Sequence, residues 1–353
     1  MINNNQIYRQ DIDAGLKQEA NYKRLGNKKI MITGATGMVG SCLIDTMMAY
    51  SAQSGIPIRV IALARNEDKI RERFAPYLSS DYFSYVCEDI SERMPYLPVK
   101  PDIIIHAASN SHPMAYAEDP IGTIKTNVFG LDNLLRYATE AKTERLLFLS
   151  SVEVYGENNT VKERFTESDC GYIDCNTLRA GYPESKRLGE ALCQAYRAKH
   201  GIDVVIARLS RLYGPTMQMD DSKVVCQFIK RAIQNKDIVL KSSGQAVYSY
   251  TYVVDAVVAL ITILTQGKNG EVYNVADSQS ETSILQLAEL VAKVAGTKVN
   301  YEMPNATESK GYSNVQKSLM KAEKLEQLGW RPQTSLGQGI EKTIMILKEI
   351  NRK

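Results

Sequence analysis

The chain is predicted to be an α/β protein, with a Rossmann doubly wound parallel sheet followed by a smaller mixed α/β substrate lobe. Three observations predict this. Short apolar runs alternate with helix-length segments through the first 212 residues. A glycine-rich segment separates the first apolar run from the first helical segment. After residue 213 the segments become shorter and mixed.

The predicted strands are nearly continuous apolar runs, as expected for strands covered by helices on both faces. They are KIMIT (29–33), RVIALA (59–64), YFSYVCED (82–89), DIIIHAAS (102–109), RLLFLSS (145–151) and VVIARLS (204–210). Helices are predicted between them, over 39–50, 66–78, 120–141 and 182–200. Strands and helices that alternate in this way form right-handed βαβ units and therefore a parallel sheet.

Three regions follow from this pattern. Residues 1–28 form a polar N-terminal extension, predicted to be helical over Asp13–Leu25. Residues 29–212 form the Rossmann domain, and residues 213–353 mainly form the C-terminal lobe. In that lobe we expect helices over 224–234, from Asp255, over 283–295 and over 337–351, and strands over 237–241, 248–253 and 271–276. A ligand would lie between the lobes, at the carboxyl ends of the parallel strands.

Composition excludes several classes of protein. The 353 residues are 44% hydrophobic, which favours a large folded core. The 43 basic and 40 acidic residues nearly balance, which argues against a nucleic-acid-binding surface. No apolar run is long enough for a membrane span, and residues 1–28 hold no secretory signal. The six cysteines form no CxxC pair and have no histidine at zinc spacing, so we expect a cytoplasmic protein with reduced thiols and no metal site.

The segment TGATGMVG, residues 33–40, lies directly after a predicted strand and opens a helix. Gly34 permits a tight turn, Gly37 lets a pyrophosphate approach the backbone, and Gly40 lets helix and strand pack closely. The free N–H groups at the helix N-terminus attract phosphates. The predicted cofactor-binding residues of this turn are Gly34, Thr36, Gly37, Met38, Val39 and Gly40.

The residue after the second strand bears on which dinucleotide binds. An acidic residue there would bind the adenosine ribose and repel a 2′-phosphate, whereas Arg65 would attract that phosphate. NADP(H) is therefore preferred, with NAD(H) possible; the alternative is a solvated surface arginine. Asp89 and Ile90 are expected beside the adenine, although Asp89 would also suit a helix N-cap.

A catalytic group is predicted around Tyr182 and Lys186, which lie one helical turn apart on one face. A tyrosine hydroxyl is a weak acid at neutrality, but a neighbouring ammonium favours its phenolate and makes proton exchange with a substrate oxygen feasible. Ser151 ends a strand and would hydrogen-bond the same oxygen. Glu153 has either an acid/base role or a structural ion pair.

The chain resembles the extended short-chain dehydrogenase/reductases, in the group of nucleotide-sugar epimerases and dehydratases. The motifs occur in that family's order over Lys29–Ile350: TGATGMVG, HAAS, TNVFG, LSSVEVYG, YPESK, RLSRLYGP and LGWRP. The resemblance implies a Ser151, Tyr182 and Lys186 triad, and a C-terminal lobe that binds a nucleoside-diphosphate sugar. It implies a homodimer through the two long helices. It also implies that the cofactor is bound or supported by Ala107, Ala108, Ser109 and Asn127.

The chain differs at three positions from the pattern of the family that it resembles. Val152 stands where the similar segment of sugar 4,6-dehydratases has an aspartate. Glu153 remains, as it does in uridine-diphospho-glucuronate decarboxylases. Tyr248 replaces a diphosphate-binding arginine, and Arg211 replaces an asparagine. Arg211 would suit the diphosphate, with a structural salt bridge as the alternative. The spacing of Pro113, Tyr116 and Pro120 resembles the decarboxylases. The predicted substrate-binding residues are Ser109, Tyr116, Arg211 and Tyr248.

Three functions fit these residues. The first is net NADPH reduction of a nucleotide-linked keto sugar, for surface polysaccharide synthesis. The second is a redox-neutral decarboxylase, 4,6-dehydratase or 4-epimerase with tightly bound NAD. The third is a non-enzymatic dinucleotide sensor, which is disfavoured because Tyr182 and Lys186 are both present. Arg65 and Val152 favour the first reading.

Overall fold

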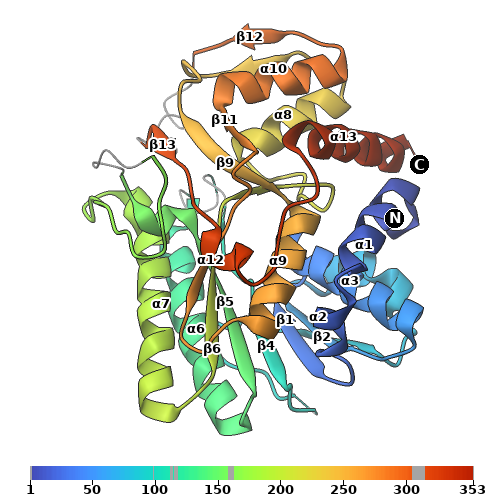
Figure 1. Cartoon of the computed structure of the whole chain (residues 1–353), viewed down its shortest axis with the longest axis vertical. Helices are drawn as coiled ribbons and strands as arrows, with labels where there is room; N and C mark the ends of the chain where they lie inside the picture. The colour runs from blue at the N-terminus through green and yellow to red at the C-terminus, as the bar shows by residue number, and fades with distance from the viewer. Residues whose placement is uncertain are drawn as a thin grey trace.

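The computed structural model describes residues 2–97, 99–111, 114, 118–157, 163–303 and 315–352. Its centre is a parallel sheet of seven strands in the order β10-β6-β5-β4-β1-β2-β3 (Figure 1). The strands are β1 (Lys29–Thr33), β2 (Arg59–Ala64), β3 (Phe83–Cys87), β4 (Ile103–His106), β5 (Arg145–Ser151), β6 (Val204–Leu209) and β10 (Val272–Val275). The predicted Rossmann architecture is confirmed.

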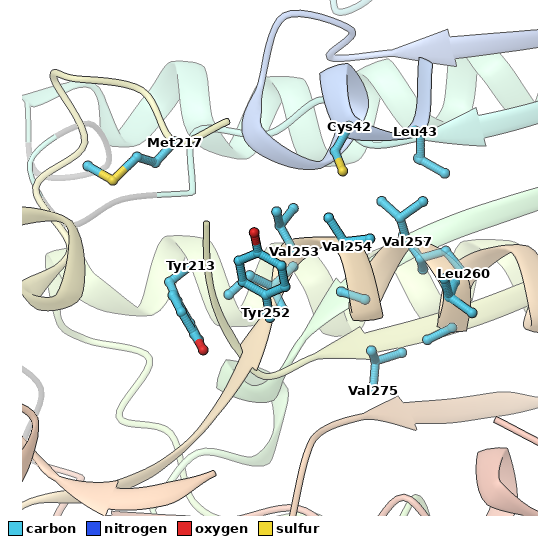
Figure 2. Close-up of a cluster of buried hydrophobic side chains, with 14 of the residues drawn as sticks. Cys42, Leu43, Tyr213, Met217, Tyr252, Val253, Val254, Val257, Leu260 and Val275 are labelled. Atoms are coloured by element: carbon cyan, nitrogen blue, oxygen red, sulfur yellow. The ribbon is translucent and has the colours of Figure 1, made fainter. Parts of the chain in front are cut away.

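Successive side chains of each strand point to opposite faces, so the sheet has two cores. Ile30 and Ile32 of β1 belong to one core, and Met31 between them belongs to the other. Helices α3 (Met38–Ser54) and α9 (Val253–Gln266) cover the first face. Helices α6 (Pro120–Ala141) and α7 (Gly181–His200) cover the second. Figure 2 shows Cys42 and Leu43 of α3 facing the valines of α9.

The helix expected over 66–78 is shorter in the structure. The described helix is α4 (Glu67–Arg73), capped by the Asn66 side chain, and a 3-10 turn, η2 (Ala75–Tyr77), follows it. Pro76 lies in that turn, and a proline has no N–H to continue an α-helix. The first helix is longer than expected, because it ends only at the left-handed Gly55.

One strand expected in the C-terminal lobe belongs to the large sheet. β10 pairs in parallel with β6, with Val272 opposite Ile206. Helix α9, which leads to it, is apolar on every side and is buried from Val253 to Leu264. An apolar helix followed by an apolar strand is one more unit of the doubly wound fold, so 213–353 is not wholly a separate lobe.

The smaller lobe contains two sheets and, among the described residues, four helices. One sheet has the order β11-β9-β13, with β7 paired to β9, and the other joins β12 to β8. The strands are β7 (Arg211–Tyr213), β8 (Ile238–Leu240), β9 (Val247–Tyr252), β11 (Glu281–Ser283), β12 (Val299–Tyr301) and β13 (Lys317–Ser318). The helices are α8 (Val224–Ile233), α10 (Ile284–Ala295), the short α12 (Glu323–Glu326) and α13 (Leu336–Arg352).

The N-terminal extension is part of the folded core. It forms η1 (Ile2–Asn4), α1 (Gln6–Leu16) and α2 (Glu19–Lys23), rather than one helix over Asp13–Leu25. The Tyr8 hydroxyl donates to Asp45 of α3 at 2.8 Å. On the other side, Asp11 accepts from the Tyr252 hydroxyl at 2.7 Å and from Lys342 of α13 at 2.5 Å. The extension therefore joins both lobes, and the two termini lie close together (Figure 1).

No helix among the described residues is both long and apolar enough to cross a membrane. The cytoplasmic location stays a prediction from the cysteine pattern. Within the same residues, no group of three or more His, Cys, Asp or Glu side chains is arranged to hold a metal ion.

Candidate active site

Two adjoining cavities lie where β1, β4 and β5 end. The larger has a volume of about 830 Å³ and the smaller about 190 Å³. Both are lined by Gly34, Gly37, Ala107 and Ser109, so the glycine-rich turn forms their shared wall. This is the edge of a parallel sheet at which open α/β folds bind ligands.

The turn after β1 needs its glycines for close packing. Gly34 has a left-handed φ of 66°, and a Cβ there would lie 2.7 Å from the Ala107 carbonyl group. A Cβ on Gly40 would lie 2.4 Å from the Gly34 carbonyl oxygen. Helix α3 therefore starts directly against β1 and β4, with its first N–H groups at the cavities. Thr36 lines the smaller cavity, and Met38, Val39 and Gly40 line the larger.

The smaller lobe holds this turn from the opposite side. The Gln218 side chain donates from Nε2 to the carbonyl oxygen of Thr36 at 2.7 Å. The Thr216 hydroxyl donates to the carbonyl oxygen of Met38 at 2.9 Å. Both bonds use carbonyl groups, so they leave the N–H groups of the turn for an anion. Neither residue was predicted, because the loop between β7 and α8 has no motif of its own.

Arg65, Asp89 and Ile90 line the smaller cavity. The Arg65 side chain is 60% exposed, and its guanidinium lies 3.8 Å from the Asp89 carboxylate. Asp89 also accepts from the backbone N–H and the hydroxyl of Ser91. Burial alone would raise the pKa of Asp89, but these Ser91 bonds and Arg65 hold it below its usual value. Asp89 is therefore ionised and caps the turn that follows β3.

Ala107, Ala108 and Ser109 follow β4 and line the smaller cavity. The Ser109 hydroxyl is buried and has no hydrogen-bond partner among the described residues, which is costly unless a ligand supplies one. The glycine turn and this hydroxyl fit a dinucleotide. Asn127 is not among the described residues that line either cavity. Its amide instead donates to the Ser185 hydroxyl at 2.8 Å, which joins α6 to α7.

Ser151, Tyr182 and Lys186 all line the larger cavity. Ser151 ends β5, and its hydroxyl accepts from the backbone N–H of Glu153 at 3.2 Å. Tyr182 and Lys186 lie one turn apart at the start of α7, with the ammonium 6.0 Å from the centre of the Tyr182 ring. The Lys186 ammonium donates to the Leu149 carbonyl at 2.8 Å. Burial lowers the pKa of Lys186 to about 7.

Glu153 lies between two arginines in the same cavity. Arg179 donates to its carboxylate at 3.0 Å, and an Arg211 nitrogen lies 3.7 Å from its other oxygen. Burial alone would raise the pKa of Glu153, but the two guanidiniums hold it below its usual value. Glu153 is therefore ionised near neutrality and has no proton to donate. Of the two roles expected from the sequence, the structure shows the ion pair.

Arg211 and Tyr248 lie against each other. The Arg211 guanidinium carbon is 3.7 Å from the centre of the Tyr248 ring, a close cation–π contact. The Tyr248 hydroxyl donates to the Val315 carbonyl at 2.8 Å, which fixes the ring in place. Both residues line the larger cavity. The two unusual residues of the sequence thus form one structural pair, in which the tyrosine supports the arginine.

A buried polar network supports the site from behind. The Ser150 hydroxyl donates to Glu190 of α7 at 2.6 Å, and Arg208 of β6 binds the same carboxylate with two nitrogens at 2.9 and 2.7 Å. This network fixes α7, and with it Tyr182, relative to the ends of β5 and β6.

Sequence reasoning missed Arg179, although a signal existed: it stands three residues before Tyr182, in the segment that leads into the catalytic helix. Pro113 and Tyr116 lie outside the described residues. Tyr116 therefore stays a predicted substrate-binding residue without a structural test.

Fold and site together define an extended short-chain dehydrogenase: a Rossmann sheet with a glycine-rich turn, a Ser–Tyr–Lys group at its carboxyl edge and a second lobe over it. A sequence model described as "NAD dependent epimerase/dehydratase family" matches residues 30–276. The chain belongs to this family of NAD-dependent enzymes that act on nucleotide sugars.

Curated relatives include UDP-glucuronic acid decarboxylase 1 of Xenopus tropicalis, 33% identical over 90% of this chain and 71% of the relative. UDP-glucuronic acid decarboxylase 6 of Arabidopsis thaliana is 30% identical over 89% of this chain and 87% of the relative.

Two solved structures share the fold. UDP-glucose 4-epimerase of Thermotoga maritima has a TM-score of 0.77 at 22% identity, covering 92% of this chain and 99% of its own. A dTDP-glucose 4,6-dehydratase of Streptomyces venezuelae with NAD bound has a TM-score of 0.76 at 24% identity, covering 91% and 97%.

Proposed function

We propose that the chain is a redox-neutral enzyme that retains NAD and decarboxylates a nucleotide-linked sugar acid, with UDP-glucuronic acid as the substrate to test. One observation carries this: the ionised Glu153, between two arginines, shares a cavity with Ser151 and Tyr182. Relatives 30–33% identical over about nine tenths of the chain bear the name UDP-glucuronic acid decarboxylase. This favours the second of the three functions over net reduction.

The proposed chemistry follows from the position of the carboxyl group. A carboxylate leaves readily as carbon dioxide when the carbon β to it is a ketone, because the electron pair then enters an enolate. Bound NAD would supply the oxidation that makes this ketone and the reduction that removes it, so no external oxidant is needed. The carbon that loses the carboxyl group takes up a proton from solvent in its place, so the products are carbon dioxide and a UDP-linked pentose.

The residues of the chain would move and hold protons around this step. Tyr182 takes the proton of the sugar hydroxyl during oxidation and returns it during reduction. Ser151 hydrogen-bonds the same oxygen, and stabilises the negative charge that it carries in the enolate. Lys186, one turn along α7, favours the phenolate form of Tyr182 when it is charged.

Retention of the cofactor is supported by the contacts across the glycine turn. Gln218 and Thr216 tie the smaller lobe to the carbonyl groups of Thr36 and Met38. A dinucleotide whose pyrophosphate lies at this turn would be enclosed between the lobes. A redox-neutral cycle needs no exchange of cofactor, whereas a net reductase must release it after every turnover.

The experiment is product analysis with the purified protein and no added cofactor. Incubation with UDP-glucuronic acid should yield a UDP-pentose, one carbon dioxide lighter by mass spectrometry. Tyr182→Phe should retain the bound dinucleotide and form product at least about 10²-fold more slowly. This proposal is overturned if folded protein with NAD bound leaves UDP-glucuronic acid unchanged.

A second candidate rests on Arg65. Its guanidinium lines the smaller cavity and is largely exposed, which suits the 2′-phosphate of NADP(H). In this case the enzyme would reduce a nucleotide-linked keto sugar at the expense of NADPH, in surface polysaccharide synthesis. Arg65→Asp separates the two: it should weaken NADPH binding strongly if the phosphate is bound there, and leave the decarboxylase unimpaired with NAD.

We also propose a homodimer through α6 and α7. Large apolar side chains are exposed on these helices, with Ile121 68%, Phe129 53% and Leu188 48% accessible. A second copy would cover them, since apolar side chains gathered on adjoining helices favour an interface. Phe129→Asp should halve the mass measured by light scattering if this face is the interface.

A further inference from the structure

The N-terminal helix α1 lies outside the cleft but is bonded to both lobes. Among the described residues that line the two cavities, none belongs to α1 (Gln6–Leu16). The helix packs against α3 of the Rossmann domain, against α9, and against α13 of the smaller lobe. Tyr8 and Asp11, one helical turn apart on α1, are both buried and bond to different lobes. A helix placed in this way fixes the distance between the elements that it joins.

On the Rossmann side, α1 holds the helix that begins at the glycine-rich turn. The Tyr8 hydroxyl donates to the Asp45 carboxylate of α3 at 2.8 Å. Asp45 is almost fully buried, and it also accepts from Arg73 and, at 3.0 Å, from the Tyr77 hydroxyl. Because α3 starts at Met38, this carboxylate lies about two turns along the helix whose first residues line the larger cavity. The position of the turn therefore depends on how α3 is held.

On the other side, α1 holds the end of β9. The Asp11 carboxylate accepts from the Tyr252 hydroxyl at 2.7 Å and from Lys342 of α13 at 2.5 Å. Tyr252 lies opposite Tyr213 of β7 in the sheet, with the two ring centres 5.7 Å apart (Figure 2). Asp11 therefore fixes the place at which β7 ends.

The loop that leaves β7 at this place closes over the glycine-rich turn. It begins at Gly214, where a Cβ would lie 2.4 Å from the Val253 side chain, so the loop is packed tightly beside Tyr252. A few residues later, Thr216 and Gln218 donate to carbonyl groups of the turn at 2.9 and 2.7 Å. The loop and the turn are thus in direct contact, and α1 joins the strand end before the loop to the helix after the turn.

We propose that α1 is a positioning element that keeps this loop closed on the glycine-rich turn and so slows release of the dinucleotide, a role that rests on the proposed retention of NAD but not on the decarboxylation. Tyr8 and Asp11 are its positioning residues. If the bond at either end is broken, α1 no longer holds the loop and the turn at a fixed distance. Loss of the bond at the other end then has little further effect.

The test is a double-mutant cycle with Tyr8→Phe and Tyr252→Phe, measured in the purified protein with its NAD bound. Each variant removes one hydroxyl and keeps the shape of the ring. The carboxylate that loses this donor keeps a cation, Arg73 in one case and Lys342 in the other, so both variants should fold. Excess isotopically labelled NAD is added, and mass spectrometry follows its exchange into the bound pool.

Each single variant should release NAD about 3–10-fold faster than wild type, which is part of the value of one hydrogen bond to a charged group. The double variant should match the faster single variant within about twofold, because both bonds act through one helix. Bonds that act independently would instead multiply the two factors.

Two control variants separate NAD release from stability. Tyr50→Phe on α3 removes a buried hydroxyl that has no hydrogen-bond partner among the described residues, so it should leave the release rate unchanged. Ile202→Val trims a buried side chain in the core under α6 and α7. It should lower the melting temperature without changing the release rate.

Two results would overturn this role of α1. One is a lower melting temperature of both single variants with an unchanged release rate, which would make the two bonds purely structural. The other is a double variant whose rate is the product of the two single effects. A wild type that exchanges NAD within one turnover contradicts the proposed retention, while the cycle still tests α1. A wild type that shows the coupling but leaves UDP-glucuronic acid unchanged supports the role of α1 and contradicts the decarboxylation.

Discussion

The two halves of the cleft are built from different parts of the chain. The proposed cofactor side is built mainly around backbone, namely the turn from Gly34 to Gly40 and the end of β4. The proposed sugar side has charged side chains from separate segments, with Glu153 after β5, Arg179 before α7 and Arg211 on β7.

This difference explains which half the sequence predicts. A backbone site requires glycines at fixed spacing, and such spacing is visible in one short motif. A side-chain site needs only that its charges meet in space, so its members can move to new positions. Arg211 and Tyr248 illustrate this, because together they place one cation on Glu153 from an unusual strand position.

The largest expected effect is the loss of proton transfer at the sugar side. Tyr182→Phe removes the hydroxyl and should lower kcat by about 10²–10⁴-fold, the usual contribution of a general acid–base. Cofactor content, measured by absorbance after denaturation, should stay unchanged. If the variant loses cofactor to the same extent as activity, Tyr182 acts in cofactor binding instead of proton transfer.

The next largest effect is expected when one methyl group is added to the glycine-rich turn of the proposed cofactor site. Gly40→Ala places a Cβ 2.4 Å from the Gly34 carbonyl oxygen, so backbone atoms must shift at a cost of about 1–3 kcal/mol. The variant should melt at a lower temperature and purify without dinucleotide. The matched control is Gly337→Ala in α13, where a Cβ meets nothing within 4 Å; it should be as stable as wild type or slightly more so.

The buried lysine makes the stability of the cofactor-free protein depend on pH. Burial lowers the pKa of Lys186 to about 7, against about 10.4 in the unfolded chain. Between these values the unfolded state binds more protons, so stability should rise with pH through this window. Lys186→Met removes the titrating group, and should therefore stabilise the protein more at pH 7 than at pH 10 in denaturant titrations. An equal effect at both pH values would contradict the buried charge.

The smallest effect concerns the contacts that the smaller lobe makes with the turn. Gln218→Ala removes one hydrogen bond of 2.7 Å to the Thr36 carbonyl, worth about 0.5–1.5 kcal/mol. Cofactor should dissociate about 2–12-fold faster in stopped-flow displacement. The neighbouring exposed Met219→Ala serves as a control that leaves the rate unchanged. If the cofactor dissociates from both variants at the same rate, this hydrogen bond does not contribute to cofactor retention.

Sequence predicted the strands of the large sheet well, because strands buried on both faces must be apolar runs. It placed β10 in the C-terminal lobe, whereas β10 belongs to the large sheet. The reason is that α9 and β10 both follow residue 213, where the elements become shorter and mixed. It could not predict that residues 1–28 join the two lobes, because their hydrogen-bond partners are far away in the sequence. Tyr8 binds Asp45, and Asp11 binds Lys342. The supporting role of Asn127 stays a prediction, and the structure shows its amide in the contact between α6 and α7.

In the proposed reaction, one bound cofactor both oxidises the sugar and reduces it again. UDP-glucuronic acid deuterated at the carbon β to its carboxyl group tests this, with products analysed by mass spectrometry. The UDP-pentose should keep the deuterium at this carbon, with carbon dioxide released and no reduced nicotinamide consumed. Loss of the deuterium to free cofactor, or turnover only when NADPH is supplied, would contradict it.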